Sequence, residues 1–345
     1  MDKTRDHNGK QGHRGLDWED MLGLRDIARD SRGVVLILVL STVAMFTAMV
    51  LSFSSDQGYD IELAYNFRDS LQAYFLADAG VEAAKALLKD DNPNYDGLDE
   101  DWAKFSEYAA ASSAFLDGPV FVGEITDECS KIDINSLVKE DGEPDPTRIE
   151  QLKRLFGILN IDITEDELNN LIDAIIDWLD PDDEPTDLGG AEDDFYQALD
   201  RPYVCKNRNM DTIEEILLVK GMKKEYFYGT KDYEGISKYI TVGTGGKINI
   251  NTASKEVLMS LSDDIDDADV EDIMDHRPYK RIEDAKKEMY SVTSSPSQVD
   301  DLITVESKRF KVEVTASMPS GANLVLTAVI DRSSGTPKVV YYKIH

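Results

Sequence analysis

Val34–Phe53 reads VVLILVLSTVAMFTAMVLSF, twenty consecutive residues without a charged side chain. At the helical rise of about 1.5 Å per residue, this segment spans the roughly 30 Å hydrocarbon core of a bilayer. Arg29 and Arg32 precede it, whereas Asp56 and Asp60 follow it. By the positive-inside rule, the asymmetry predicts a retained anchor with a cytoplasmic N-terminus and the bulk of the chain outside the cytoplasm. A cleaved secretory signal peptide is the alternative, but its apolar stretch is shorter and ends at a small-residue cleavage site.

The helical pattern continues beyond the apolar run, through Ile61–Lys89. Proline is absent from residues 34–89, so nothing interrupts a helix there. Apolar side chains recur at three- and four-residue steps, which is typical of a helix that packs along one side. They are Leu63, Phe67, Leu71, Tyr74, Phe75, Val81 and Leu88. One helix, half in lipid and half packed on a folded domain, is therefore predicted.

Composition excludes several classes of function. The 345 residues include 68 acidic and 37 basic side chains, for a net charge of −31. A nucleic-acid partner is disfavoured, because such binding rests on Lys and Arg that displace counterions. Only four histidines occur, three of them close to the termini, so a His-centred catalytic site has almost nothing to be built from. Nucleophile-elbow, zinc-protease and phosphate-loop motifs are absent, and we expect no enzyme.

Beyond the long helix, strand and helix patterns mix in the manner of an α+β domain. Alternating apolar residues predict strands at 119–126, 131–135, 239–242, 247–250, Arg309–Ser317, Asn323–Asp331 and Lys338–Ile344. Helical spacing predicts helices at 147–159, 165–179, 211–219 and within 253–290. Thr164 and Glu167 have the spacing of a capping box at the start of the second helix.

Two short segments of the chain resemble each other. Lys131-Ile-Asp-Ile-Asn135 and Lys247-Ile-Asn-Ile-Asn251 share the pattern K-I-x-I-N, and each precedes a helical region. We interpret them as an internal repeat.

The leader and anchor resemble those of type IV pilins and pseudopilins. The resemblance rests on Ser31-Arg32-Gly33 followed by the apolar Val34–Leu38, a charged leader that ends in glycine. It implies cleavage by a prepilin peptidase between Gly33 and Val34, with methylation of the new N-terminus. Such families usually carry Glu at the fifth residue after the cut, where this chain has Leu38. Translation from Met1 gives a leader of 33 residues, whereas Met21 would give a shorter and more usual one.

The missing Glu and the K-I-x-I-N repeat together resemble the K-type minor pseudopilin of type II secretion. Further matching phrases are Gln72–Glu82, Ile176–Asp180, Gly190–Glu192 and Tyr196. The resemblance implies a pilin-type long helix and antiparallel sheet with inserted all-helical, SAM-like segments. It predicts a leader at 1–33, a transmembrane helix at 34–53, a pseudopilin α/β domain at 54–135, 236–252 and 305–345, and helical segments at 136–235 and 253–304.

The same resemblance implies a structural role and a location. We expect an inner-membrane, single-pass subunit with a periplasmic domain, placed at the tip of the pseudopilus, where it helps to initiate assembly for protein export. The implied partners are the I- and J-type minor pseudopilins, the pseudopilus shaft, the inner-membrane secretion platform and the prepilin peptidase. The alternatives are a minor pilin of a type IV pilus, and a membrane-tethered helix-hairpin-helix protein for DNA uptake.

The segment Asp177–Asp194 (DWLDPDDEPTDLGGAEDD) is strongly acidic and contains no Lys or Arg. Crowded carboxylates repel one another unless a cation lies among them, and Ca²⁺ accepts six to eight oxygen ligands in flexible geometry. Pro185 stands where an EF-hand loop needs glycine, so the segment is not an EF-hand. A solvated charged face is the alternative. We predict a calcium site, which the resemblance also implies, with ligands Asp177, Asp180, Asp182, Asp183, Asp187 and Glu192.

Two other acidic runs carry weaker signals. Asp263–Asp272 lies where a helix is expected to begin, and negative charge is favourable at a helix N-terminus without any ion. The loop at Asp91–Asp96 is weaker still as a metal site.

Two cysteines, Cys129 and Cys205, would lie in an oxidising compartment if the domain is exported. A disulfide between them is predicted, and two unpaired buried thiols are the alternative.

Overall fold

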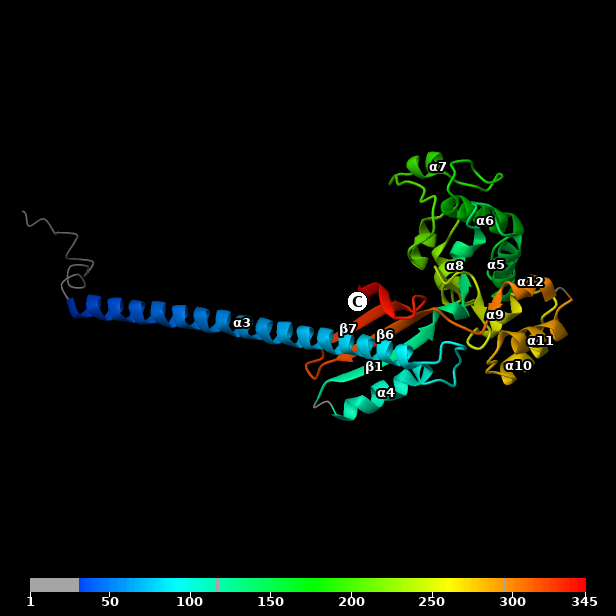
Figure 1. The fold of residues 1–345 in the computed structure, drawn as a ribbon. Helices are drawn as coiled ribbons and strands as arrows, with labels where there is room; N and C mark the ends of the chain where they lie inside the picture. Colours follow the sequence, from blue (N-terminus) through cyan, green and yellow to red (C-terminus); the bar gives the residue numbers. More distant parts are fainter. Residues whose placement is uncertain (1–30, 116–117, 295) are drawn as a thin grey trace, which may run out of the picture. The chain divides into compact units, whose positions relative to one another are not determined.

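A computed structural model describes residues 31–115, 118–294 and 296–345 (Figure 1). The predicted leader, residues 1–33, lies outside the described residues except for its last three positions, so the choice between Met1 and Met21 stays a prediction. The chain divides into two compact units, residues 1–68 and 69–345.

Helix α3 runs without interruption over Ser31–Asp90, which confirms the single long helix predicted from the absence of proline. In its first part, the side chains from Val34 to Phe53 are exposed. The hydroxyls of Thr42 and Thr47 donate to the carbonyl oxygens of Leu38 and Val43, at 2.7 and 2.8 Å. These bonds satisfy polar groups within the helix, as a lipid environment requires. Within the described residues, α3 is the helix that is long and apolar enough to cross a membrane.

In the second unit, four antiparallel strands form a sheet in the order β1-β6-β7-β8. Their bounds are β1 Val120–Asp127, β6 Arg309–Ser317, β7 Asn323–Asp331 and β8 Lys338–Ile344. The three C-terminal strands match their predicted bounds, because buried and less buried residues alternate along β6 and the strands are paired over most of their length. The pairing of β7 with β8 has one irregularity, between Val329 and Ile330.

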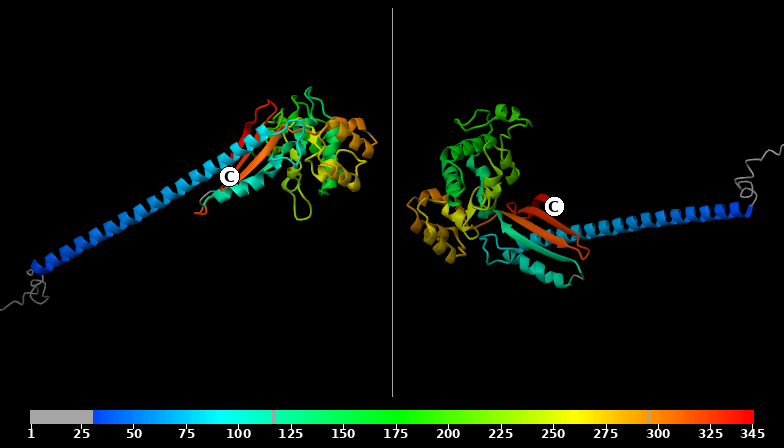
Figure 2. Two further views of the ribbon diagram at one scale, coloured as in Figure 1. Left: turned by 60° about the horizontal axis from the view of Figure 1, so that its bottom comes forward. Right: turned by 180° about the vertical axis from the view of Figure 1, so that it is seen from behind.

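The first hydrophobic core, here called the sheet core, lies between this sheet and the last part of α3. Alternate residues of β6 (Phe310, Val312, Val314 and Ala316) are fully buried in it. The helix contributes small side chains to the same core: Ala73, Ala77, Val81, Ala84 and Leu88. A Cβ on Gly80 would lie 2.9 Å from Val314 Cγ1, so glycine permits the close approach of helix and strand. Helix α4 (Phe105–Ser112) lies beside β1 (Figure 2). Its Phe105 belongs to the same core.

The second core, here called the helical core, contains the helices of residues 130–305. Figure 2 shows them gathered beyond one end of the sheet. Their bounds are α5 Pro146–Ile158, α6 Glu165–Leu179, α7 Asp193–Gln197, α8 Lys224–Tyr228, α9 Lys255–Met259, α10 Asp267–Asp275, α11 Ile282–Val292 and α12 Pro296–Asp300. The short 3-10 helices near this core are η3 Glu128–Ser130, η4 Ile134–Leu137, η5 Ile213–Leu218 and η6 Ile236–Lys238. Two more, η1 Trp102–Lys104 and η2 Ser113–Phe115, flank α4.

Local signals placed several helices correctly. Helix α6 has the predicted bounds, and Thr164 and Glu167 form the predicted capping box. The helix predicted at 211–219 is instead the 3-10 helix η5, and the region 253–290 is broken into three helices.

The K-I-x-I-N repeat has a structural counterpart. Each copy forms a two-residue strand, β2 Ile132–Asp133 or β4 Ile248–Asn249, paired in parallel with a strand that follows its helices. Those partners are β3 Ile240–Thr241 and β5 Ile303–Thr304. Residues 236–252 were predicted as part of the pseudopilin α/β domain. Ile236, Ile240 and Ile248 lie in the helical core because their strands pair outside the four-stranded sheet.

The final asparagine of each copy makes the same contact. Asn135 accepts from Met210 N (2.8 Å) and donates to Met210 O (3.0 Å). Asn251 accepts from Tyr279 N (2.7 Å) and donates to Tyr279 O (2.9 Å). Both side chains therefore close a long loop on a single backbone residue, and we call this contact the asparagine brace.

A buried polar junction connects the two cores. Asp127, at the end of β1, accepts hydrogen bonds from Asn249 Nδ2, Thr252 Oγ1 and Ser307 Oγ at 3.0, 2.6 and 2.6 Å. Asn249 also donates to the carbonyl of Asp96, at 3.0 Å. Because Asp127 is buried, its pKa is raised, although each of these donors opposes that shift.

Candidate metal centre in the acidic loop

The acidic loop connects the end of α6 to α7 and is organised by Asp177. This fully buried carboxylate accepts from Thr186 N (2.8 Å) through Oδ1 and from Ala191 N (2.5 Å) through Oδ2. Gly190 is required beside it, since a Cβ there would lie 2.3 Å from Asp177 Oδ2. Both oxygens of Asp177 are thus occupied by backbone amides, so the residue shapes the loop.

Three of the predicted ligands come together inside this loop. Carboxylate oxygens of Asp180, Asp182 and Glu192 all lie within 4.8 Å of one another. Asp180 and Glu192 are only 5% and 4% exposed. Asp180 Oδ1 and both Glu192 carboxylate oxygens are buried without a hydrogen-bond partner. Unpaired buried carboxylate oxygens are costly, and a bound cation would satisfy them.

The pKa values of Asp180 and Glu192 also indicate a site that would bind a cation. Burial, together with the neighbouring carboxylates of Asp182 and Asp177, raises the pKa of Asp180 to about 7. Burial also raises the pKa of Glu192 to about 7, with Asp177 and Asp180 adding to the shift. The site therefore accumulates negative charge that a proton or a metal ion would neutralise.

The other predicted ligands lie apart from this group. Asp183 accepts from Asn207 Nδ2 at 3.0 Å and is exposed. Asp187 is an exposed residue with φ 45°, and its charge acts on Asp173 of α6. Both residues belong to the outer part of the loop.

Sequence reasoning missed Asn207. Its Oδ1 is buried without a hydrogen-bond partner, while its Nδ2 donates to Asp182 O at 2.5 Å. Asn207 is therefore a candidate fourth oxygen donor. No local pattern indicated it, because it lies 25 residues after Asp182 and outside the acidic run.

The surroundings of the loop are rigid. Trp178 packs edge-on against Tyr196 and Tyr203, with ring centroids 5.2 and 6.2 Å apart. Lys220 Nζ donates to the carbonyl oxygens of Gly189 and Gly190, at 3.0 and 2.9 Å. The three grouped side chains, Asp180, Asp182 and Glu192, all offer hard oxygen donors. Such a set suits Ca²⁺.

The other two acidic runs have ordinary partners. The side chain of Asp266 caps α10 by accepting from Ala268 N and Asp269 N, as expected for a carboxylate at a helix N-terminus. Arg332 pairs with Asp91 at 2.8 Å and also with Asp96, so a guanidinium already neutralises that loop.

The predicted disulfide is not formed in the structure, where Cys129 and Cys205 are separate buried thiols. Cys129 Sγ accepts from Lys308 N at 3.4 Å, near the polar junction. Cys205 Sγ lies against the acidic loop, 3.5 Å from Asp177 O. Burial raises the pKa of each thiol to about 12, so neither is a reactive thiolate at neutral pH.

Helix α3 carries the remaining predicted site. Gly33 and Val34 lie exposed in its first turns, and a Cβ on Gly33 would have no neighbour within 4 Å. Cleavage between them stays a prediction. Further along, Leu71 and Phe75 are 38% and 62% exposed, although Ala73 and Ala77 between and beyond them are buried.

Family models match the residues of the helical core. A family model described as "Type II secretion system (T2SS), protein K" matches residues 130–242, and a second with the same description matches residues 248–303. The chain belongs to the type II secretion system protein K family. The two matched segments begin close to the two copies of the K-I-x-I-N repeat and end near their partner strands.

Curated members of the protein K family align over most of the chain. Type II secretion system protein K of Pseudomonas aeruginosa is 28% identical over 72% of this chain and 73% of that protein. The Aeromonas hydrophila protein K is 25% identical over 84% of this chain and 90% of that protein. A chain in the crystal structure of the GspK-GspI-GspJ complex from enterotoxigenic Escherichia coli has a TM-score of 0.64 at 17% identity. That match covers 82% of this chain and 99% of the other, and it shows a shared fold.

Membership in the protein K family makes this chain a structural component of a secretion system. Its long apolar helix fits an inner-membrane anchor. The mixed helix and sheet of the structure agrees with the predicted α+β class.

Proposed function

We propose that this protein K family member is a minor pseudopilin at the tip of the type II secretion pseudopilus. There it would help to initiate assembly with the I- and J-type minor pseudopilins and so support protein export. The matched crystal structure is titled as a complex of GspK with GspI and GspJ, which supports partners of that kind.

The observation that carries the proposal is that two sides of α3 differ. One side is buried against the sheet of the same chain, and the other remains exposed. Its alanine-rich side, with Ala73, Ala77 and Ala84, is buried against its own sheet. Leu71 and Phe75 on the same helix stay exposed, and so do Leu63 and Phe67 before them. These four residues recur every fourth position, so they form an apolar stripe suited to packing against partner helices.

Leu38 supports a position at the tip. In pilin-like filaments, a Glu at this place is taken to neutralise the terminal amine of the neighbouring subunit above. An unpaired charge at bilayer depth costs at least several kcal/mol, so that pairing matters. A subunit with Leu38 has no carboxylate to pair with the terminal amine of a subunit above it. Its own terminal amine can still pair with the Glu of a subunit below. The large helical core argues the same way, because its bulk would obstruct packing within a shaft.

Three further assignments belong to the same proposal. The prepilin peptidase would cut between Gly33 and Val34 and the new N-terminus would be methylated. The helical segments would be SAM-like insertions on a periplasmic domain that meets the pseudopilus shaft and the inner-membrane secretion platform. Calcium would occupy the acidic loop. Mass spectrometry of protein extracted from membranes should find an N-terminus at Val34, and an uncut leader in cells with active peptidase would refute the processing step.

Charge placed on the apolar stripe tests the proposed role. Full-length chain in detergent should co-purify with the I- and J-type subunits. Leu71→Glu and Phe75→Glu should reduce this recovery at least about tenfold, because a buried unpaired charge costs several kcal/mol. Leu98→Glu is the matched control, since Leu98 is 60% exposed in a loop after α3 and should behave like wild type. Equal recovery of all variants would overturn the proposed contact.

A further inference from the structure

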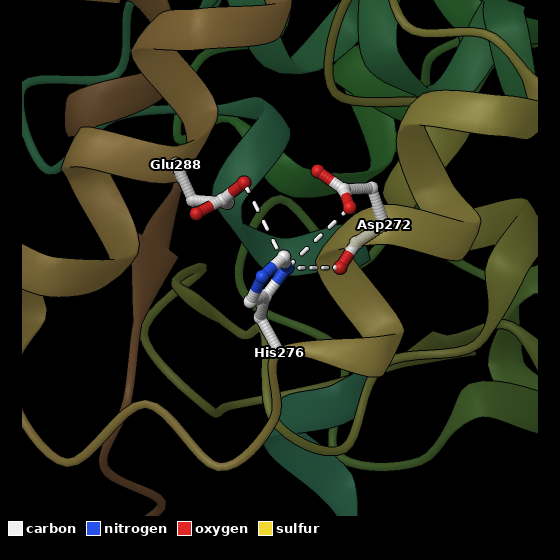
Figure 3. A group of neighbouring side chains, drawn as sticks. All are labelled: Asp272, His276 and Glu288. Carbon is white, nitrogen blue, oxygen red and sulfur yellow. Dashed lines mark hydrogen bonds and ion pairs between the residues drawn. The ribbon is translucent and has the colours of Figure 1, made fainter.

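The turn between α10 and α11 gathers one imidazole and two carboxylates (Figure 3). His276 is the C-cap residue of α10, Asp272 lies one helical turn before it, and Glu288 comes from α11. His276 Nδ1 is 3.6 Å from Asp272 Oδ1 and 4.0 Å from Glu288 Oε1. It also donates to the backbone oxygen of Asp272, at 2.8 Å. One ligand atom from each of the three side chains lies within 4.8 Å of the others.

Buried residues of the helical core hold these three side chains in place. Ile273 and Met289, the neighbours of Asp272 and Glu288 in sequence, are fully buried. Tyr279, in the turn between the helices, donates through its hydroxyl to Ile273 O at 3.0 Å and is held by the asparagine brace at Asn251. The backbone that carries the three side chains is thus fixed before any ligand arrives, which lowers the cost of binding.

Negative charge at this turn lacks a basic partner. In the part of the chain that the structure describes, the ion pairs of Asp272 and Glu288 are with His276 and not with Lys or Arg. The site therefore favours a cation.

We propose that Asp272, His276 and Glu288 form a binding site for a divalent transition-metal ion of the zinc class. One nitrogen and two carboxylate oxygens are ligands that Zn²⁺ accepts, with water left to complete the coordination. Tetrahedral bonds of about 2.0–2.2 Å place ligand atoms about 3.3–3.5 Å apart. The spacings of 3.6 and 4.0 Å around Nδ1 need to close by only about half an ångström.

Metal binding would change the protonation of His276 in a defined way. The ion takes the lone pair of Nδ1, so the proton that Nδ1 shares with Asp272 O is released to solvent or replaced by the Nε2–H tautomer. The Asp272 carbonyl keeps the hydrogen bond that it accepts from His276 N, at 3.2 Å. The imidazole distinguishes this site from the acidic loop, where the candidate ligands are all oxygens and suit calcium.

Zinc titration of the full-length chain tests the proposal. The protein is held in detergent with saturating Ca²⁺, stripped of transition metals and titrated with Zn²⁺ against a chromophoric chelator. His276→Ala should lose one zinc equivalent relative to wild type. Glu288→Gln should weaken that equivalent at least about tenfold, since even outer-shell partners of metal ligands are worth about 10–100-fold. Co²⁺ bound at the site should show the strong visible absorption of low-coordinate cobalt, and His276→Ala should remove it.

Matched controls separate this site from general zinc binding. Glu283→Gln changes an exposed acid of α11 with no contact to His276, and His345→Ala removes another exposed imidazole. Neither should alter the zinc equivalent that depends on His276. The proposal is overturned if, in saturating Ca²⁺, wild type and His276→Ala bind the same amount of zinc with the same affinity. Glu288→Gln keeps the size of the side chain, so it tests the site even if His276→Ala perturbs the fold.

Discussion

The two repeat copies share one framework and differ in what they hold. In each, a two-residue strand is followed by an asparagine brace that closes a loop on a backbone residue. The first brace reaches 75 residues ahead, from Asn135 to Met210, whereas the second reaches 28, from Asn251 to Tyr279. The residue that is braced lies just before a helix in both copies, η5 in the first and α11 in the second.

Much of the difference in length lies between the end of the last long helix and the braced residue, at 180–209 in the first copy and 276–278 in the second. In the first copy the long segment after α6 contains Asp180, Glu192 and their unpaired buried oxygens. In the second, α10 is followed at once by a short turn that Tyr279 fixes through its own hydrogen bonds. A short turn can be held by the protein core alone. A long acidic loop has more chain entropy to overcome, and a bound cation is a means of holding it.

The third residue of K-I-x-I-N shows a second difference. Asp133 accepts from the amides of Gly243, Thr244 and Gly245 at 3.0, 2.7 and 2.9 Å, a ring of donors that suits a carboxylate. Asn249, at the same place in the second copy, instead donates to the carboxylate of Asp127. The carboxylate of Asp133 therefore lies among hydrogen-bond donors, whereas the amide of Asn249 lies beside a carboxylate that accepts its hydrogen bond.

The largest expected effect comes from giving the second copy the residue of the first. Asn249→Asp would face Asp127 with a second buried carboxylate and should destabilise the fold by about 3–5 kcal/mol. Urea unfolding of residues 69–345, which contain both cores, measures this loss. The reverse change, Asp133→Asn, keeps one acceptor oxygen and should cost about 1–3 kcal/mol.

The pH dependence of stability tests whether repulsion between the two carboxylates causes the loss in Asn249→Asp. Two facing carboxylates share a proton, so the folded-state pKa of the Asn249→Asp pair lies above the unfolded value of about 4. Stability of the variant should therefore fall as pH rises through the folded-state pKa, and its deficit should shrink in mild acid. A deficit that is independent of pH would indicate a steric cause.

Removal of each brace tests whether the copies are energetically equivalent. Asn135→Ala and Asn251→Ala each leave a buried N–H and C=O unpaired, so each should cost about 2–4 kcal/mol. Asn323→Ala, at the exposed start of β7, is the control and should change the unfolding free energy by less than about 0.5 kcal/mol. Costs that differ by more than about 2 kcal/mol would show that the two copies make the same hydrogen bonds but that these bonds contribute unequally to stability.

Sequence reasoning succeeded where the signal is local. The strands Arg309–Ser317 and Asn323–Asp331 have an unbroken two-residue alternation, and the box of Thr164 and Glu167 depends on four consecutive residues. Family resemblance rested on motifs in their chain order, and the comparisons confirmed it.

Sequence reasoning failed where distant segments meet. The ligand prediction counted carboxylates along the acidic run, but Asp187 is exposed and outside the group, and Asn207 comes from a later segment. Of the large apolar residues that predicted the packed side of α3, Val81 and Leu88 are buried, whereas Leu71 and Phe75 are exposed. The structure also buries Ala73 and Ala77, which the prediction did not include. Small side chains allow the closest approach to the sheet, and hydrophobic spacing does not show this.

Calcium should stabilise the first copy selectively. A ligand that binds only the folded state adds about 2.7 kcal/mol at a hundredfold excess over Kd, so melts with calcium and with chelator should differ by several degrees. Asp180→Ala combined with Asp182→Ala should abolish the difference. Asp187→Asn is the control, because Asp187 lies outside the group and Asn tolerates its positive φ. Wild-type melts that coincide with and without calcium would end the calcium assignment.

The smallest expected effect concerns the caps of α6 and α10, which occupy corresponding places in the two copies. Thr164 Oγ1 accepts from Glu167 N at 3.3 Å, and Asp266 Oδ1 accepts from Ala268 N and Asp269 N at 2.9 and 3.1 Å. Thr164→Ala and Asp266→Ala should each cost about 1 kcal/mol in urea unfolding.

The pH dependence of the Thr164→Ala effect shows whether the capping box acts as a unit. Hydrogen bonds from Thr164 lower the pKa of Glu167, with Lys223 adding to the shift. A lowered folded-state pKa means that this part of the stability is present above the unfolded pKa and is lost as pH falls through the folded one. The cost of Thr164→Ala should therefore be largest at neutral pH and smaller once Glu167 is protonated. A cost that stays constant from neutral pH into acid would mean that the threonine hydroxyl acts without its glutamate partner.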